Sequence, residues 1–243
     1  QLSPDTKIDG SWEGCSGYHY DDKTIYGFSH THLNGTGCTD YGDIMLMPTM
    51  GAVSFNPEEY GSKFSHTNEK ATAGFYAVTL DKHNIDVQLT ASTRVGFHEY
   101  KFNKSGTANF ILDFNHRDKL LYGDIKIIDN KTIEVLRRSE AWAKDQYVYA
   151  RIEFDKPLAI SKVVANQENR SGYYSGTELK LALSKEVKAG ETIKVKVALS
   201  PVDCLGALAN LKAETAGKSF DKINAETHAK WEKELSVVQA KGD

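Results

Sequence analysis

Residues 179–199 have the sequence LKLALSKEVKAGETIKVKVAL, in which apolar and polar residues alternate in two short runs. The alternating apolar positions are Leu179, Leu181 and Leu183 in the first run, and Ile193, Val195, Val197 and Leu199 in the second. Successive side chains of a β-strand point to opposite faces, so an apolar residue at every second position predicts a strand with one buried face. The two runs therefore predict two half-buried strands, separated by Ala189 and Gly190.

The same period of two extends through most of residues 74–201. It recurs around residues 85–89, 110–114, 125–127, 133–135 and 148–154. Asp129, Asn130 and Lys131 form a turn signal, which predicts a hairpin between the flanking strands. Because no helical pattern interrupts these strands, we predict an all-β fold, a large, supersandwich-like antiparallel β-sandwich.

The periodicity changes after Pro201. Leucines spaced three residues apart from Leu205 to Leu211 suit a short helix, and apolar residues recur every three or four positions from Phe220 to Val238. The second pattern predicts an amphipathic helix, and Ser219 is placed to cap its start. We therefore divide the chain into a β-sandwich domain at residues 1–200 and a helical linker at residues 201–243. The apolar face of the second helix must cover either the flank of the sandwich or a further domain.

The overall composition excludes several classes of protein. The 243 residues carry a formal net charge of −3, which argues against a general nucleic-acid binder. No apolar run approaches the ~20 residues that a membrane-spanning helix needs, so no membrane span is expected. The first residue is Gln1 rather than Met, and we expect that a leader or a longer N-terminal segment has been removed.

The cysteines leave two interpretations open. Cys15, Cys38 and Cys204 are too few and too scattered for a disulfide scaffold or a four-ligand zinc site. They are either three reduced and mostly buried thiols, or a Cys15–Cys38 bridge with Cys204 left over.

Residues 1–50 differ from the rest of the chain. They hold seven acidic residues against two basic ones, together with six aromatic residues, three histidines and seven glycines. This mixture suits sugar recognition, because aromatic faces stack on a pyranose while carboxylates and imidazoles bind its hydroxyls. A structural interpretation also exists, in which the segment forms tightly turned strands with buried rings.

Two motifs in this segment suggest catalysis or metal binding, and both are weak. A nucleophile elbow around Ser16 would need a glycine where Tyr18 stands, and the sequence lacks the strand-to-helix context. His30 and His32 would point the same way on a strand, and a carboxylate such as Asp40 or Asp43 would be needed to complete a metal site. Hydrogen bonding by the two imidazoles is the better interpretation, so these two motifs assign neither a nucleophile nor a metal site.

Several longer blocks of sequence together resemble one family. They are GCSGYHY at residues 14–20, GFSHTHL at 27–33, GTGC at 35–38, DYGD at 40–43 and MPT at 47–49. Further matching blocks are TRVGFH at residues 93–98 and the helical region around Trp231. The chain closely resembles the N-terminal domain of glycoside hydrolase family 92, and the similarity runs over nearly its whole length.

The resemblance implies a fold and an activity for the whole protein. Members of this family are calcium-dependent exo-α-mannosidases that act with inversion, and many are secreted bacterial enzymes that trim glycans. An N-terminal β-sandwich is joined by helices to an (α/α)₆ barrel, which carries the catalytic acid, the catalytic base and the calcium ligands. Such a chain would be inactive alone and would bind no calcium itself. Its expected location is secreted, periplasmic or on the outer surface of a bacterial cell.

The resemblance also implies where α-mannoside glycans would be bound. The N-terminal domain would dock on the C-terminal catalytic domain of the same polypeptide and contribute loops to the mannose pocket. By position, the expected substrate-binding residues are Trp12, Glu13, Cys15, Ser16, His30, His32, Asp40 and Asp43.

Two other functions remain open from the sequence. One is a freestanding carbohydrate-binding module with a β-sandwich fold, and the other is a purely structural domain in which Trp12, His30 and His32 are buried. If a partner domain is absent, we expect the isolated chain either to dimerise or to expose an apolar patch near its N-terminal motifs and C-terminal helix.

Overall fold

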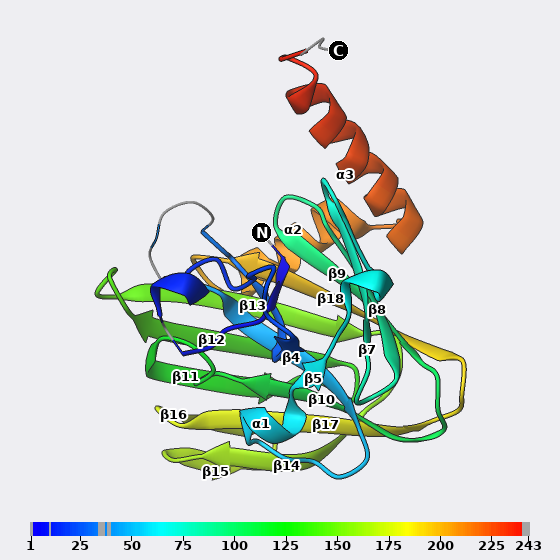
Figure 1. Ribbon diagram of the computed structural model, residues 1–243. Coiled ribbons are helices and arrows are strands. Elements are labelled where there is room, and N and C mark those ends of the chain that lie inside the picture. The colour runs from blue at the N-terminus through cyan, green and yellow to red at the C-terminus, as the bar shows by residue number, and fades with distance from the viewer. Residues whose placement is uncertain (1, 10, 34–36, 38–39, 240–243) are drawn as a thin grey trace.

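The computed structural model describes residues 2–9, 11–33, 37 and 40–239. Two large sheets face each other as the layers of a sandwich, and two helices follow them at the C-terminal end (Figure 1). Every strand pairing in the described part of the chain is antiparallel. The predicted antiparallel β-sandwich is therefore confirmed.

The smaller layer is a six-stranded sheet. Its strands, in spatial order, are β1 (Ser3–Asp5), β3 (Gly27–His30), β4 (Asp43–Met50), β10 (Gly106–Asp113), β17 (Leu179–Val187) and β14 (Ala159–Ala165). Its central strand β4 is buried from Asp43 to Thr49, so both of its faces are covered. A strand buried on both faces shows no alternation in its sequence, which is why the period of two does not reveal β4.

The larger layer is a ten-stranded sheet. Its strands, in spatial order, are β15 (Glu168–Arg170), β16 (Tyr173–Gly176), β11 (Lys119–Ile127), β12 (Thr132–Glu140), β13 (Gln146–Phe154), β18 (Glu191–Ser200), β9 (Val95–Phe102), β8 (Ile85–Ala91), β7 (Phe75–Leu80) and β6 (Glu69–Thr72). The hairpin predicted at residues 129–131 is confirmed, because β11 pairs with β12 and Ile127 lies opposite Ile133. The remaining short elements are β2 (Thr24–Ile25), β5 (Ser62–Lys63), α1 (Pro57–Tyr60), η1 (Trp12–Gly14) and η2 (His66–Asn68).

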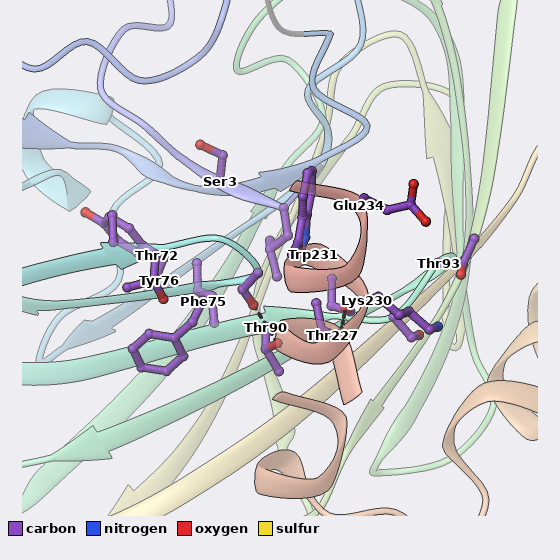
Figure 2. Close-up of a pocket in the computed structure, with 16 residues that line it drawn as sticks. Ser3, Thr72, Phe75, Tyr76, Thr90, Thr93, Thr227, Lys230, Trp231 and Glu234 are labelled. Carbon is purple, nitrogen blue, oxygen red and sulfur yellow. Dashed lines mark hydrogen bonds between the residues drawn. The ribbon is translucent and has the colours of Figure 1, made fainter. Parts of the chain in front are cut away.

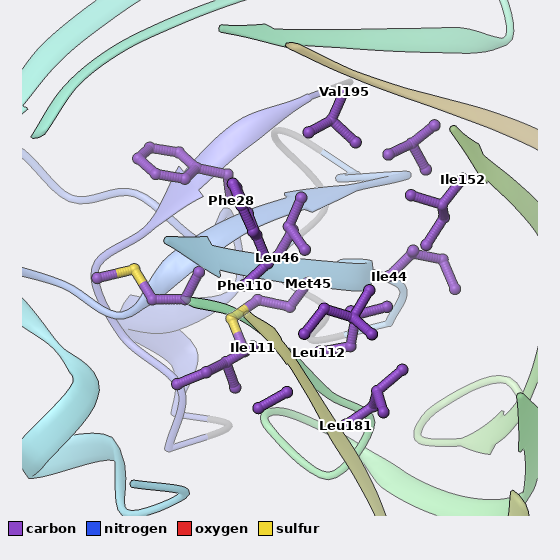
Figure 3. Close-up of a cluster of buried hydrophobic side chains, with 14 of the residues drawn as sticks. Phe28, Ile44, Met45, Leu46, Phe110, Ile111, Leu112, Ile152, Leu181 and Val195 are labelled. Carbon is purple, nitrogen blue, oxygen red and sulfur yellow. The ribbon is translucent and has the colours of Figure 1, made fainter. Parts of the chain in front are cut away.

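The two half-buried strands predicted from residues 179–199 belong to different layers. β17 pairs with β10 in the smaller sheet, whereas β18 pairs with β13 and β9 in the larger one. The chain therefore crosses from one sheet to the other at Ala189 and Gly190. The apolar faces of both strands point into the same core, where Leu181 and Phe110 face Ile152 and Val195 (Figure 3).

The C-terminal segment forms the two predicted helices. α2 (Cys204–Thr215) packs on β18 and β13 through Ala207 and Leu211. α3 (Phe220–Leu235) begins at Ser219, whose side chain accepts a hydrogen bond from the backbone N–H of Lys222 at 3.2 Å. No helix in the described part of the chain is long and apolar enough to cross a membrane.

Only the first half of α3 is covered by the sandwich. Phe220 and Ile223 are buried in a small cluster with Val95 and Phe97. Leu235 and Val238, at the far end of the predicted apolar face, are 57% and 81% exposed. The helix projects away from both sheets (Figure 1). The predicted apolar face therefore exists, and its far end at Leu235 and Val238 is exposed.

Candidate functional site

The N-terminal segment carries a short exposed turn at residues 11–16, which we call the η1 turn. Ser11 caps η1 by accepting from the backbone N–H of Gly14. The Trp12 side chain is 74% exposed, and Glu13 is exposed in an ion pair with Lys7. Four of the predicted site residues, Trp12, Glu13, Cys15 and Ser16, therefore lie on this exposed or half-exposed turn.

His30 lies in the core rather than at the surface. Its Nδ1 is 3.1 Å from the carbonyl oxygen of Ile44, and its Nε2 is 3.1 Å from Nε2 of His98. The Nδ1 of His98 is in turn 2.8 Å from the hydroxyl of Tyr100. Burial lowers the pKa of His30 to about 4 and the pKa of His98 well below its ordinary value, because a charged imidazole is poorly solvated there. Both rings are neutral members of a buried hydrogen-bond chain.

His32 is also buried, but it faces a different group of residues. Its Nε2 is 2.8 Å from the hydroxyl of Ser29 and 3.7 Å from Oδ1 of Asp5. Burial lowers the pKa of His32, and it raises the pKa of Asp5 to about 7 although the guanidinium of Arg117 opposes that rise. His30 and His32 point to different partners because β3 ends at His30 and the next residue, Thr31, has a positive φ of 62°.

Asp43 forms a fully buried ion pair. Its Oδ1 accepts from Nη1 of Arg137 at 2.7 Å, and its Oδ2 accepts from the hydroxyl of Thr31 at 2.8 Å. Arg137 also donates to Asp118 and, through Nε, to the carbonyl oxygen of Phe114 at 3.0 Å. The contacts of the Asp43 carboxylate are thus internal, and they tie β4 of one sheet to β12 of the other.

Asp40 joins the N-terminal segment to the hairpin between β12 and β13. It is buried, and its Oδ1 accepts from the backbone N–H of Ala143 at 2.9 Å. The neighbouring Trp142, which is not among the predicted site residues, is 80% exposed. Asp40 therefore holds a second exposed tryptophan next to the N-terminal segment.

Three residues in or close to β3 and β4 have an unusual backbone conformation. Thr31, Tyr41 and Ile44 have φ values of 62°, 67° and 53°. Positive φ is costly for side chains branched at Cβ, such as those of Thr31 and Ile44. Backbone strain of this kind gathers at functional sites, where the surrounding structure enforces it. These strained residues lie next to the predicted site residues His30, Asp40 and Asp43.

The described residues bring no metal-ligand group together. Among residues 2–9, 11–33, 37 and 40–239, no three His, Cys, Asp or Glu side chains lie close enough to hold a metal ion. A calcium site needs six or more oxygen ligands, so the described residues offer no arrangement that fits one. Cys15 and Cys204 are free thiols, and burial raises the pKa of Cys204 to about 11. Cys38, the other half of the bridge considered above, lies outside the described residues.

A groove of about 600 Å³ lies elsewhere, between α3 and strands β6 to β8 (Figure 2). Trp231 and Thr227 of α3 line one side, and Phe75 and Thr90 line the other. Thr227 donates to the carbonyl oxygen of Ala91 at 2.7 Å, which fastens the helix to the sheet. None of the eight predicted site residues lines this groove. It lies where α3 packs on the larger sheet.

Comparison with known proteins decides the family. The model of the glycosyl hydrolase family 92 (GH92) N-terminal domain matches residues 1–200. This chain belongs to that family. In this GH92 N-terminal domain the matched residues end with β18, and α2 and α3 follow them.

Solved GH92 structures share the fold over the whole chain. The GH92 α-mannosidase BT3965 of Bacteroides thetaiotaomicron, solved with mannoimidazole, is 31% identical with a TM-score of 0.92, and the match covers 100% of this chain and 34% of that one. The inverting mannosidase BT2199 of the same organism is 24% identical with a TM-score of 0.85, over 99% of this chain and 32% of that one.

A curated relative is described as an uncharacterized secreted glycosidase of Arthroderma benhamiae. It is 22% identical over 96% of this chain and 34% of its own length. The GH92 N-terminal domain described here thus spans about a third of the length of these relatives.

The eight predicted site residues of the GH92 N-terminal domain divide into two groups. Trp12, Glu13, Cys15 and Ser16 are reachable from outside, whereas the side chains of His30, His32, Asp40 and Asp43 are buried and hydrogen-bonded internally. Arg117 and Arg137 form hydrogen bonds with the N-terminal segment, and the sequence did not predict either role. They lie about a hundred positions away along the chain, and no local pattern links them to it.

Proposed function

We propose that this chain is the N-terminal domain of a secreted, inverting exo-α-mannosidase, in which the η1 turn forms one wall of the mannose pocket. The observation that carries the proposal is the exposure of Trp12 on a turn within a confirmed GH92 N-terminal domain. The indole offers an apolar face for a pyranose ring, and the Glu13 carboxylate beside it can accept hydrogen bonds from sugar hydroxyls.

The buried histidines and carboxylates take a different part in this proposal. His30, His32, Asp40 and Asp43 hold the segment behind the wall and do not themselves touch sugar. Asp40 orients the Trp142 hairpin, and Asp43 joins the segment to the larger sheet through Arg137. The pocket wall is thus made of exposed side chains on a backbone that buried polar contacts keep in place.

The remainder of the pocket would come from the rest of the polypeptide. The chain spans about a third of the length of its relatives, so a C-terminal catalytic domain has room to follow it. The exposed end of α3 at Leu235, together with Val238 just after the helix, offers that domain an apolar docking face. Interfaces between domains of one chain commonly bury several hundred Å² or more on each side, so other exposed surface would have to take part as well.

We propose that binding and catalysis are divided between this chain and the C-terminal domain. Inversion needs two carboxyl groups on opposite sides of the scissile bond, roughly 6.5–9.5 Å apart, with a water between them. The η1 turn supplies one exposed carboxylate, Glu13, and it is paired with Lys7. We therefore assign binding to this chain, and the acid, the base and the calcium ligands to the C-terminal domain. The isolated chain would then be inactive.

The test is hydrolysis of an aryl α-mannoside by the full-length protein. We expect Trp12→Ala to raise KM by about tenfold, because a stacked ring contributes on the order of 1 kcal/mol or more, and Trp12→Phe to restore most of the affinity. Full activity in a protein lacking residues 1–243 would overturn the proposal. Tight binding of mannose by the isolated chain, measured by calorimetry, would favour a freestanding carbohydrate-binding module instead.

A further inference from the structure

Arg117 lies behind the η1 turn, in the connection between β10 and β11. Its side chain is 2% exposed. The Nη2 group donates to the carbonyl oxygens of Gly14 and Cys15 at 2.7 and 2.6 Å. The Nη1 group lies 3.4 Å from Oδ1 of Asp5 in β1. One guanidinium therefore binds the end of the η1 turn and a strand of the smaller sheet at once.

Two other contacts flank the η1 turn: Glu13 pairs with Lys7, and the backbone N–H of Thr6 donates to the carbonyl oxygen of Gly17 at 2.6 Å. Trp12 and Glu13 are exposed, and Gly14, the buried residue of η1, has no side chain to pack. The backbone bonds of Gly14 and Cys15 to Ser11 and Trp12 close the turn on itself, so they fix its shape and not its position. Arg117 is thus the buried side chain that fastens Gly14 and Cys15, two and three positions after Trp12, to the body of the sandwich.

The Arg117 side chain also leaves no room for a side chain at a second place in the N-terminal segment. Gly42 has a φ of +73°, and a Cβ atom there would lie 2.9 Å from Cδ and Nη1 of Arg117. The carbonyl oxygen of Gly42 lies 2.8 Å from Nε2 of His116, the residue before Arg117. His116 thus contacts the Gly42 segment, and Arg117 contacts the η1 turn. The resemblance to the family places both of these segments at the sugar.

The chemistry of this position favours arginine over lysine. A planar guanidinium presents several N–H donors in fixed directions, so one group can serve two carbonyl oxygens while another faces a carboxylate. A lysine ammonium is a point charge on a flexible stem and cannot hold the same three partners in one geometry.

We propose that Arg117 is the positioning residue of the η1 turn: it sets where Trp12 stands relative to the Gly42 segment and so controls sugar affinity. The affinity part of this inference rests on the proposed function. The positioning part concerns this chain alone and can be measured without substrate.

The first experiment measures steady-state hydrolysis of an aryl α-mannoside by full-length protein with Arg117→Met or Arg117→Lys. Loss of the two carbonyl contacts should raise KM by about tenfold with a smaller change in kcat, because binding and not chemistry is affected. Arg117→Lys should recover only part of the affinity. Arg151→Met is the matched control, since Arg151 also binds two partners, Glu134 and Glu153, but lies on β13 away from the turn. Unchanged KM in Arg117→Met would overturn the affinity part.

Removing Arg117 also leaves Asp5 buried without its cation, which could unfold the chain. The pair Asp5→Asn and Asp5→Asn/Arg117→Met avoids this problem, because neither variant carries the carboxylate. If Arg117 acts through the carbonyl oxygens of Gly14 and Cys15, the double variant has a KM about tenfold above that of Asp5→Asn. Equal KM values in these two variants would contradict the proposal.

The second experiment follows alkylation of Cys15 by a maleimide, with peptide mapping to separate it from Cys38 and Cys204. Cys15 lies on the turn and is half-buried, so loosening the turn should increase its labelling rate several-fold in Arg117→Met and leave Cys204 unchanged. Equal rates in wild type and variant would overturn the positioning role. Faster labelling in a protein that hydrolyses no α-mannoside would retain that role and refute the proposed function.

Discussion

Arg137 and Asp43 form an ion pair of 2.7 Å in which neither side chain is exposed to solvent. The pair joins β12 of the larger sheet to β4 of the smaller one, and Thr31 donates to the other carboxylate oxygen. Charges inside a core are tolerated only where partners satisfy them. The pair therefore fixes the start of β4, next to the positive-φ residues Thr31 and Ile44, to the centre of the sandwich.

Removing one partner of this ion pair should be strongly destabilising. Asp43→Asn leaves the Arg137 guanidinium buried with reduced compensation, and such losses commonly cost about 3–5 kcal/mol. Urea unfolding of the chain measures the change. Arg138→Met, which breaks the exposed pair with Asp145, is the control and should leave the free energy of unfolding nearly unchanged. A similar small change in both variants would show that the buried pair contributes little.

The stability of the chain should depend on the ionisation of Asp5. Burial raises the pKa of this carboxyl to about 7, above its ordinary value of 3.8. The protonated form is thus favoured on folding, and its contribution is complete below pH ~4 and lost as the pH rises toward 7. Asp5→Asn does not ionise, so its stability relative to wild type should increase between pH ~4 and ~7, by up to about 4 kcal/mol.

Unfolding of both proteins at several pH values measures this difference. The low pKa of His30 has the opposite effect on stability, which increases as the pH rises from about 4 toward 6.5. His30 is present in both proteins, so its effect cancels in the comparison. A difference that stays constant with pH would contradict the raised pKa of Asp5.

Replacement of His30 should affect stability more than sugar binding. His30→Leu leaves the carbonyl oxygen of Ile44 and the ring of His98 without their partner, at a cost of about 1–3 kcal/mol. Because the ring is buried, we expect KM for an α-mannoside to change by less than about threefold in folded full-length protein. His228→Leu, on the exposed side of α3, is the control for stability. A large rise in KM with normal stability would place His30 at the sugar.

The glycine at position 17 should not tolerate a side chain. Its φ is +80°, and a Cβ atom there would lie 2.3 Å from Cε1 of His32. Gly190 has a similar φ of +85°, but its Cβ atom would meet nothing within 4 Å. Gly190→Ala should therefore show only the cost of positive φ, roughly 1–2 kcal/mol, and Gly17→Ala a clearly larger loss. Equal losses in thermal or urea unfolding would mean that the His32 ring moves aside freely.

The end of α3 should matter only when the rest of the polypeptide is present. Leu235→Ser and Val238→Ser change exposed side chains, so unfolding of this chain alone should shift by no more than about 0.5 kcal/mol. In the full-length protein the same changes should lower the melting temperature if α3 carries the docking face. Val202→Ser, at another exposed apolar site, is the control. No effect in either protein would move the docking face elsewhere.

Two patterns determined the fold class from the sequence alone. They are the apolar residues at every second position and the apolar face predicted for the second helix. These patterns revealed five strands of the larger sheet (β8, β11, β12, β13 and β18), two of the smaller sheet (β10 and β17), the hairpin at residues 129–131 and both helices, because one-sided burial leaves a local pattern. The motifs of residues 14–43 were enough to identify the family. Tertiary structure alone decided that β17 and β18 lie in different layers and that β4 is buried on both faces.

Tertiary structure also decided which of the eight site residues face outward. His30 is buried where His98 forms a hydrogen bond with it, and Asp43 is buried where Arg137 pairs with it. Trp12 is exposed on a turn whose carbonyl oxygens accept from Arg117. A polar side chain can enter a core only where partners satisfy it. These partners lie roughly 70–100 positions away along the chain. No local pattern of residues contains that information, because it arises only when the two sheets come together.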